Sequence, residues 1–411
     1  MLRSIVMARS ALNPRLRSLA CWIASALSVW GGITLESDGY HVRPGDRIQD
    51  ALDQAATNAV QKTVWVHAGT YRPDAKRQAL VWFNRRHDGI RLVALGEVTL
   101  SAAHPALSAA HESAHPAVVN HVAYFGDGVS TNTLMRGFRL TGANAFLTQD
   151  GTPALEPNRT ILKNHFFYSD GGAVKVFGRS APRLVELTIE DNFTRPCGAG
   201  ISVQQQGFRE TPVLIASCRF LNNRAQGTGP AIDLLAGSSA KILNCLFVGN
   251  ISNTGEDLVA KASGEKPFAN NGAITIFWES LALVQNCTFT GNRNGVDDMG
   301  GDSVYVANLF HANRAEGGLP GFPHYELAVN AGGRVENCVI LGPVHDAKKV
   351  IDPTKNRLQG PDPRFDADWV PQAPEYAGIG YRPMTRAKSP APAPALPAPP
   401  VTAAPPVPAS R

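Results

Sequence analysis

The sequence predicts an all-β solenoid, and three observations support that prediction. First, the phrase NCLFVGN at 244–250 returns as NCTFTGN at 286–292, and the related SCRFLNN stands at 217–223. Second, apolar and polar residues alternate within each copy, which is the period of a β-strand. Third, Gly-rich turns and a second short strand follow each copy, such as AIDLL at 231–235. Strand–turn units that recur at uneven intervals are typical of stacked rungs joined by loops of variable length.

The stacking of rungs predicts columns of matching side chains. Neighbouring rungs lie about 4.8 Å apart, so Cys218, Cys245 and Cys287 are expected in one inward column. The same column accepts Leu187 and Asn308, which neither a metal site nor a disulfide framework would tolerate. We therefore interpret the cysteines as small buried apolar residues.

A second column closes each phrase at a turn. Asn is suited to this place because it tolerates left-handed backbone geometry and its amide can bond its neighbours. The expected members are Asn192, Asn223, Asn250, Asn292 and Asn313.

An N-terminal capping helix is expected before the first rung. Asp46 can cap this helix, and Ile48, Leu52 and Ala55 would then share one face. Repeat folds need such a cover over the open end of their core. The strand TVWVHAGTY at 63–71 is the expected first rung.

The two ends of the chain differ from its body. Residues 1–32 have a basic start followed by a short apolar run, which predicts a signal peptide or a signal anchor. The expected location is therefore outside the cell, in the periplasm or in the cell envelope. Residues 382–411 form a Pro/Ala-rich tail that is expected to be disordered. The solenoid domain would span 37–381.

The net charge of +5 comes from these ends and does not describe the body. Four arginines precede residue 32 and four basic residues follow residue 381, with no acid in either segment, so the remaining residues carry −3. A nucleic-acid-binding domain carries its positive charge on the folded body. Nucleic acid is therefore not expected as a partner, and no membrane contact is expected beyond a possible N-terminal anchor.

On three stretches the chain resembles the right-handed parallel β-helix proteins of the pectin-lyase type. These stretches are VRPGDRIQDALDQAA followed by VWVHAGTY, the Cys/Phe/Asn rungs, and GPDPRFDADW at 360–369. The resemblance covers about residues 40–381 and implies a right-handed parallel β-helix. It also implies a substrate groove on one outer sheet, most often for uronate polysaccharides. Lyases of this type use an Arg or Lys base together with a cation or a positive side chain that neutralises the substrate carboxylate.

The stretch SDGGAVKVFGRSAP at 169–182 is the first candidate for such chemistry. The valines around Lys175 are expected to face inward, so Lys175 faces outward. We expect Lys175 as the catalytic base and Arg179 as the partner of the substrate carboxylate, with Arg195 and Asp233 binding substrate nearby. Alternatively, Lys175 and Asp233 form a solvated ion pair and Arg179 lies in a turn. The expected register of Lys175 on later rungs is Ser202, Asp233 and Thr275.

Two further features could take part. In RNGVDDMGGDS at 293–303, the residues Asp297, Asp298 and Asp302 could hold Ca²⁺ or hydrolyse a glycosidic bond, or they could form an acidic turn. The Gly-His-Gly motif of polygalacturonases and the Asp-Pro-His-Asp motif of alginate epimerases are absent, and Arg-x-Lys occurs only at 386–388, in the Pro/Ala-rich tail. Trp278 could stack on a sugar ring or shield the edge of the core.

The sequence thus predicts an exported carbohydrate-active protein that binds an acidic polysaccharide and cleaves or modifies it by β-elimination. The alternative is a non-catalytic surface β-helix that binds glycan or acts as a structural rod. A third possibility is that loops such as 253–272 fill the groove. A lyase is expected to bring Lys175, Arg179 and acids together in one open groove, whereas a binding rod is expected to show aromatic and amide ladders.

Overall fold

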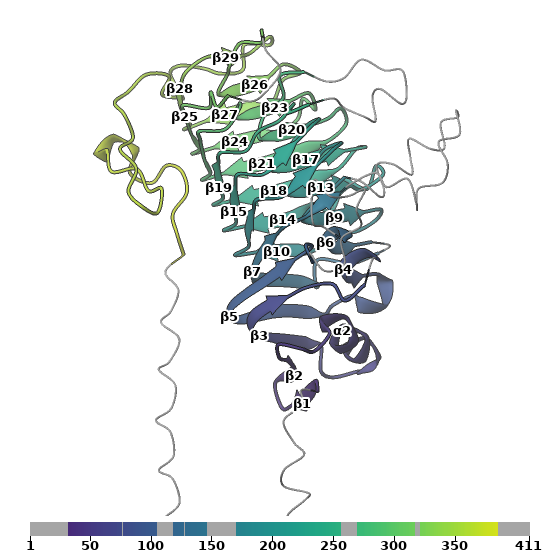
Figure 1. Ribbon diagram of the computed structural model, residues 1–411. Coiled ribbons are helices and arrows are strands. Elements are labelled where there is room, and N and C mark those ends of the chain that lie inside the picture. Colours follow the sequence, from purple (N-terminus) through teal and green to yellow (C-terminus); the bar gives the residue numbers. More distant parts are fainter. Residues whose placement is uncertain are drawn as a thin grey trace, which may run out of the picture.

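The chain forms a parallel β-helix, as the repeats predict (Figure 1). The computed structural model describes residues 32–75, 77–104, 118–126, 128–145, 170–255, 269–316 and 321–384. Almost all of the expected export signal and of the Pro/Ala-rich tail lies outside these residues. Within the described ranges, no helix is long and apolar enough to cross a membrane.

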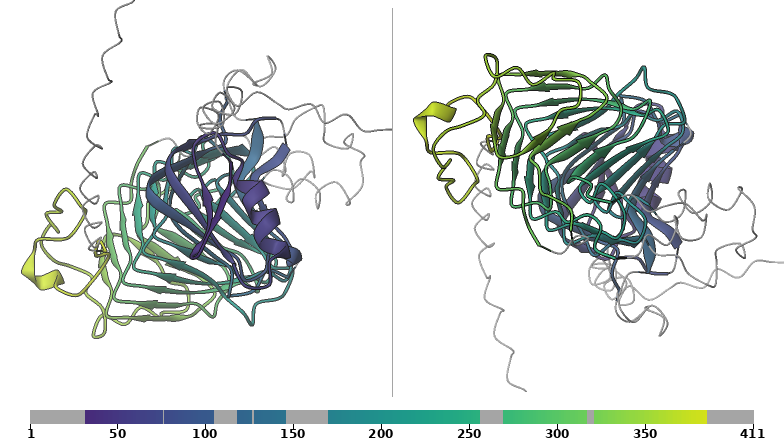
Figure 2. Two further views of the ribbon diagram at one scale, coloured as in Figure 1. Left: turned by 90° about the horizontal axis from the view of Figure 1, so that it is seen from below. Right: turned by 90° about the horizontal axis from the view of Figure 1, so that it is seen from above.

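Two long sheets form most of the wall around the core, and Figure 2 shows them along the axis of the β-helix. We call the nine-stranded sheet B. Its strands are all parallel and stack in the order β4 (Arg77–Phe83), β6 (Val119–Phe125), β9 (Val174–Phe177), β13 (Ile201–Gln204), β17 (Ile232–Leu235), β20 (Ile274–Ile276), β23 (Val296–Asp298), β26 (Leu327–Val329) and β29 (Val344–His345).

The second long sheet, sheet A, has 17 strands. It starts with the antiparallel pair β1 (Thr34–Glu36) and β2 (Gly39–Val42), followed by the long strands β3 (Thr63–Tyr71), β5 (Arg91–Ser101) and β7 (Leu134–Thr141). Each later rung contributes two short strands: β10 (Arg183–Val185) and β11 (Thr188–Glu190), β14 (Val213–Ala216) and β15 (Arg219–Leu221), β18 (Ser239–Leu243) and β19 (Leu246–Val248), β21 (Leu281–Gln285) and β22 (Thr288–Thr290), β24 (Val304–Val306) and β25 (Leu309–His311), β27 (Arg334–Glu336) and β28 (Val339–Leu341). A small third sheet contains β8 (Asn144–Ala145), β12 (Phe193–Thr194) and β16 (Arg224–Ala225).

Two residues separate the two short strands of each later rung, and the first of them has positive φ and bends the chain there. Asn244, Asn286 and Asn337 occupy three of these corners, with φ of 52° to 53°. Asn tolerates this left-handed conformation better than most residues because its short polar side chain bonds locally. The other corners are Glu186, Ser217 and Ala307.

The predicted inward columns are confirmed. Cys218, Cys245 and Cys287 are buried on successive rungs and are free thiols. The phenylalanines of the same phrases stack face to face through the core, with ring centroids 4.4–4.8 Å apart; the stack comprises Phe220, Phe247, Phe289 and Phe310. The rung spacing therefore sets the distance between aromatic rings, and each ring covers the next.

The predicted asparagine column is also confirmed, with one correction. Each Nδ2 donates to Oδ1 of the asparagine on the next rung, from Asn192 through Asn223, Asn250 and Asn292 to Asn313, at 2.7–3.0 Å. The ladder residues themselves do not have positive φ. The left-handed residue is the one before each of them, such as Asn222 at φ 55° or Gly249 at φ 67°.

The capping helix α2 (Ile48–Thr57) packs at the N-terminal end against β2, β3 and β4. The expectation that Asp46 caps it is wrong. Asp46 instead accepts the backbone N–H of Arg43 at 2.8 Å, and the N-cap residue Arg47 makes no side-chain cap. The expected apolar face is confirmed by the burial of Ile48, Leu52 and Ala55.

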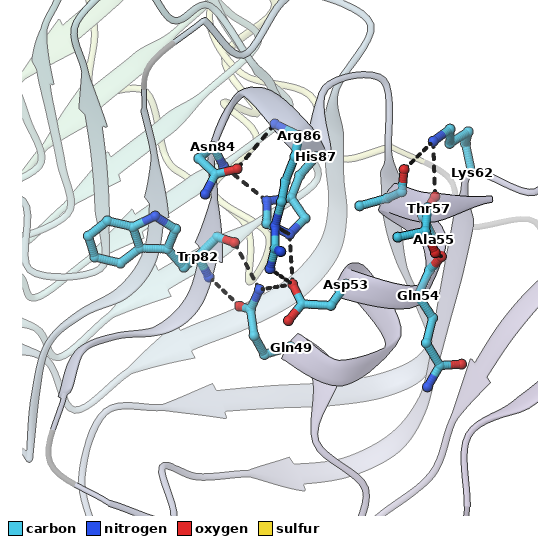
Figure 3. Close-up of polar contacts among 11 residues, drawn as sticks. Gln49, Asp53, Gln54, Ala55, Thr57, Lys62, Trp82, Asn84, Arg86 and His87 are labelled. Carbon is cyan, nitrogen blue, oxygen red and sulfur yellow. Dashed lines mark hydrogen bonds and ion pairs between the residues drawn. The ribbon is translucent and has the colours of Figure 1, made fainter. Parts of the chain in front are cut away.

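Polar contacts fix α2 to the turn that follows β4, where the short helix η2 (Arg85–His87) lies (Figure 3). Nε2 of the buried His87 lies 2.9 Å from Oδ1 of Asp53, and Nδ1 accepts the N–H of Asn84. Gln49 bonds both the N–H and the C=O of Trp82. Because these partners come from the next rung, the helix is held over the end of the core.

The C-terminal segment returns along the corner between the two strand rows of sheet A, after the short helix η5 (Pro374–Tyr376). Asn244 exchanges two 2.8 Å bonds with the backbone of Arg382, and Asn286 donates to the carbonyl of Gly378. The segment therefore binds across several rungs on the side away from sheet B.

Candidate functional site

The outer face of sheet B carries the residues that the sequence singled out. The predicted register is confirmed: Lys175, Ser202, Asp233 and Thr275 are paired across β9, β13, β17 and β20, and Asp297 on β23 continues the row. We call these five residues the outer column. All of them point away from the core, because the residues that flank them on each strand, apart from Asp298, belong to the hydrophobic core. Nevertheless, four are 0% exposed and Asp297 is 9% exposed.

The turn before each strand covers the outer column. For three of the five residues, Lys175, Ser202 and Asp233, a glycine with positive φ stands four residues earlier and lies close against the outward residue. A Cβ on Gly171 would meet the Cα of Lys175 at 3.0 Å, and a Cβ on Gly229 would meet Oδ1 of Asp233 at 2.6 Å. Glycine is required here for both its φ and its lack of a side chain. The loop backbone thus forms an extra layer over the sheet.

Lys175 is held within a closed polar cluster under this layer. Its Nζ donates to Oδ1 of Asp170 at 2.5 Å, to Oε1 of Gln204 at 3.0 Å and to Oγ of Ser202 at 3.3 Å. Ser202 donates in turn to the other oxygen of Asp170 at 2.6 Å. Burial raises the pKa of Asp170, and the ammonium of Lys175 opposes that rise. The three N–H donors of the ammonium group therefore have buried acceptors.

The outward orientation of Lys175 was predicted correctly, but its exposure was not. The expected open groove around Lys175 and Arg179 is replaced by a buried ion pair with Asp170, and the solvated alternative with Asp233 is wrong as well. Arg179 is exposed and lies with its guanidinium carbon 5.1 Å from the ring centre of Phe208. Among the described residues, these two basic groups do not converge on a common acid.

Asp233 lies further along the outer column and is also fully buried. Both of its oxygens lie 3.2 Å from Oγ1 of Thr228, and the thiol of Cys197 is a further hydrogen-bond neighbour. Burial raises its pKa to about 8, and the nearby Asp170 adds to the rise. At neutral pH Asp233 is therefore a protonated acid, which can donate as well as accept a hydrogen bond.

This raised pKa predicts a pH-dependent stability. Asp233 has its ordinary pKa of 3.8 when unfolded and about 8 when folded. Between these values the folded state binds the extra proton, so its stability falls as pH rises, by at most about 1.4 kcal/mol per pH unit for one group. We expect the stability of Asp233→Asn relative to the wild type to rise steadily from pH 5 to pH 8 in urea titrations, because only the wild type loses stability with rising pH at this position. The exposed Asp302→Asn is the matched control, and parallel pH profiles for Asp233→Asn and wild type would contradict the assignment.

Arg195 follows β12 and lies half-buried, and burial lowers its pKa. Among the described residues, no contact joins it to Lys175 or Asp233. Its expected role in substrate binding stays a prediction.

The three acids of the expected Ca²⁺ loop do not meet. Asp297 and Asp298 are consecutive residues of β23, so their side chains lie on opposite faces of sheet B. Asp297 points outward and accepts Nδ2 of Asn271 at 2.8 Å, and burial raises its pKa to about 6. Asp298 points inward and accepts the hydroxyl of Tyr305 at 2.8 Å. Asp302 is exposed in the following turn, so one ion cannot bind all three.

A second row of outward residues is less covered. We call it the edge column, because it lies where sheet B turns towards sheet A. Its members are Phe177, Gln204, Leu235, Phe277 and Met299; Phe177, Leu235 and Met299 are half-buried, and Phe277 is 9% exposed. The row is mostly apolar. It was not predicted from the sequence, because the strands were identified by their inward-facing residues and the outward residues at their ends were not considered.

Trp278 lies next to the edge column, in the turn after β20, and is 60% exposed. Its ring meets that of Phe277 edge to face at 6.0 Å. The residues at this position on the adjoining rungs are Ala236 and Gly300, by extension of the strand register. Both of these neighbours are small residues. Trp278 was expected either to stack on a sugar ring or to cover the edge of the core, and its exposure favours the first role.

Comparison with known proteins adds little to this description. No family model matches the chain, and no curated protein matches it. Among solved structures, it is similar to the catalytic domain of a GH87 alpha-1,3-glucanase in complex with nigerose, at 9% sequence identity and a TM-score of 0.19. That match covers 81% of this chain and 70% of the other, and its TM-score is too low to support an argument. The strand pairing of the chain itself establishes that it is a parallel β-helix.

Proposed function

We propose that the protein binds a polysaccharide along the edge column of sheet B, with Trp278 as the stacking platform. The observation that carries this proposal is the 60% exposure of Trp278 beside a half-buried apolar row. The pyranose ring of a sugar has an apolar C–H face, and exposed aromatic rings with a polar handle bind such faces. The proposal includes export to the cell envelope or beyond, as the start of the chain predicts.

The shape of the edge column suits a polymer. Its residues come from successive rungs, so the row runs along the axis of the β-helix. An extended chain of sugars laid on this row would contact several rungs at once, which adds contact area without any movement of the backbone. The rigid scaffold therefore supplies a preformed surface, and preformed surfaces lose less entropy on binding.

Two exposed arginines lie near this edge, beside the exposed acids Glu210 and Glu279, and could pair with the carboxylates of an acidic polymer. Arg179 is exposed and stacks on Phe208, and Arg209 is exposed and donates to the backbone carbonyl of Glu279, next to Trp278. A planar guanidinium binds a carboxylate through two parallel hydrogen bonds. A uronate polymer could thus place its rings on Trp278 and its carboxylates near the two arginines.

Binding without cleavage is the form of the proposal that the geometry favours. A lyase base must lose its proton and reach the substrate, whereas the ammonium of Lys175 has three buried acceptors. Asn253 and Asn271 bond one another, and Asn271 bonds Asp297, so described parts of the 253–272 loop cover the outer column. Within the edge column, Phe177, Leu235 and Met299 stay partly accessible, and Trp278 beside them is exposed.

The test is to measure binding and cleavage together. The purified protein is titrated with pectate, alginate, hyaluronan and chondroitin, and the ultraviolet absorbance of unsaturated uronate is followed in the same samples. We expect saturable binding to at least one polymer and no rise in absorbance. A rise in absorbance would replace the proposal by β-elimination, and absence of binding to every acidic polymer would overturn it.

Trp278→Ala is expected to weaken polymer binding about tenfold, because one aromatic stack contributes up to about 1.5 kcal/mol. Trp278→Phe should retain part of the affinity. The control is Phe322→Ala, which removes an aromatic side chain that is 44% exposed in another loop. The two variants should unfold at the same denaturant concentration as the wild type. Equal affinities for Trp278→Ala and Phe322→Ala would contradict the role of Trp278.

A further inference from the structure

The hairpin of β1 and β2 brings three potential metal ligands together at the N-terminal end of the β-helix. Glu36 ends β1, Asp38 lies in the turn, and His41 belongs to β2. Nε2 of His41 lies 3.0 Å from Oδ1 of Asp38 and 3.7 Å from Oε2 of Glu36. One ligand atom of each residue lies within 4.8 Å of the other two.

These distances suit a tetrahedral ion. Zinc binds His nitrogen and carboxylate oxygen at about 2.0–2.2 Å, so two ligand atoms on a tetrahedron lie roughly 3.3–3.6 Å apart. The distances of 3.0 and 3.7 Å from His41 lie within about 0.3 Å of that range. An ion could therefore enter with small side-chain rotations and no change of the hairpin backbone.

The second ring nitrogen of His41 has a hydrogen-bond partner, as is common for histidines that bind metals. Its ring is 7% exposed, and Nδ1 lies 3.0 Å from Nε2 of His67 on β3. A proton on Nδ1 donated to His67 leaves the lone pair of Nε2 directed at the two carboxylates. Histidines that bind metals commonly use their second nitrogen in this way, which fixes the ring and the tautomer. Trp65 donates its indole N–H to the carbonyl of Asp38 at 3.1 Å and holds the turn.

The side chains of Glu36 and Asp38 are open to solvent, so an ion could reach the Nε2 atom of His41 between two carboxylates. The side chains of Glu36 and Asp38 are 48% and 57% exposed. Arg43 contacts the other oxygen of Glu36, with Nη2 to Oε1 at 3.5 Å, and donates to Thr34. One oxygen of Glu36 therefore stays directed at His41, while a solvent path to the site is open.

We propose that Glu36, Asp38 and His41 form a Zn²⁺ site, with His67 orienting the ring of His41 and the fourth position open to water or an external ligand. One imidazole and two carboxylates suit zinc, a borderline cation, whereas Ca²⁺ prefers oxygen ligands alone. Bound zinc would join β1, an exposed edge strand, to β2. The site lies at the opposite end of sheet A from the last rungs (Figure 1) and does not depend on the proposed polysaccharide surface.

Calorimetric titration of the untagged full chain with Zn²⁺ tests this site. We expect one ion per chain, with binding unaffected by millimolar Ca²⁺. Asp38→Asn, which changes an exposed side chain without changing its shape, and His41→Ala should each weaken the site at least tenfold. His345→Ala, at the other end of the β-helix, is the matched control and should bind as the wild type does.

A second readout reports the geometry of the site. Co²⁺ in a four-coordinate N/O site gives visible absorption far more intense than that of the hexaaquo ion, and Asp38→Asn should abolish this increase. His67→Gln should lower the affinity about 10- to 100-fold, as expected for a residue that orients a metal ligand. The proposal is overturned if the wild type binds no zinc up to millimolar concentration, or if Asp38→Asn and His41→Ala bind it as the wild type does. An unchanged affinity in His67→Gln would overturn the role of His67.

Discussion

Replacement of Lys175 by methionine is expected to destabilise the β-helix by about 3–5 kcal/mol. The substitution removes the ammonium that lies 2.5 Å from Asp170, and both side chains are 0% exposed. Without the ammonium, the buried carboxylate of Asp170 has no opposite charge to offset the cost of its burial. Gln204 and Ser202 also lose the hydrogen-bond donor that Lys175 supplies. The measurement is the free energy of unfolding in urea.

Two further variants make this prediction specific. The double variant Asp170→Asn with Lys175→Met should recover most of the lost stability, because it leaves no unpaired charge. Lys241→Met removes an exposed lysine from β18 and should change the stability by less than about 0.5 kcal/mol. A lyase base would give another pattern, in which the Lys175 variant loses activity while its unfolding curve is unchanged.

Phe247→Ala is expected to cost about 3–5 kcal/mol, which is typical for removal of a buried aromatic side chain. Its ring lies between Phe220 and Phe289, at 4.8 and 4.4 Å, and is 0% exposed. The cavity cannot be closed easily, because the rungs above and below are fixed by strand pairing. In a stacked fold each rung contacts only its neighbours, so the defect interrupts the column at one place.

The same urea titration measures this effect. Phe322→Ala, at an exposed loop aromatic, is the control and should be near neutral. We expect the transition of Phe247→Ala to broaden or split, since the halves on either side of the defect lose their coupling. A loss below about 1 kcal/mol with an unchanged transition would show that the aromatic column does not hold the rungs together.

The fold was predictable because its signals are local and repeated. The phrase around Cys245 and Phe247 returns with the same alternation, so the inward columns and the strand register of Lys175, Ser202 and Asp233 follow from counting residues. The strand at 63–71 was found with the bounds that the structure has, but it is not the first to stack, because β2 pairs with it in parallel from the N-terminal side. Two details of turns were wrong. Asp46 bonds Arg43 instead of capping α2, and the left-handed residue precedes each ladder asparagine.

The sequence predicted which residues line the outer face of sheet B, but it did not predict that these residues are buried. Alternation decides whether Lys175 points into the core or away from it, but it does not say what lies beyond the sheet. The covering turns did leave a signal, since Gly171 and Gly229 each stand four residues before an outward side chain. Adjacent acids were also misleading, because Asp297 and Asp298 belong to a strand and not to a loop.

The sequence by itself determined the solenoid, its columns and its register, because each rung repeats a pattern of about seven residues whose meaning is set by strand geometry. Tertiary structure alone decided which polar groups are buried and which residues from separate segments meet. Lys175 is buried by its own preceding turn, and His41 meets Asp38 across a hairpin and His67 across a rung. Burial and convergence depend on the path of the chain between rungs, and the loops that set this path do not share the repeated pattern.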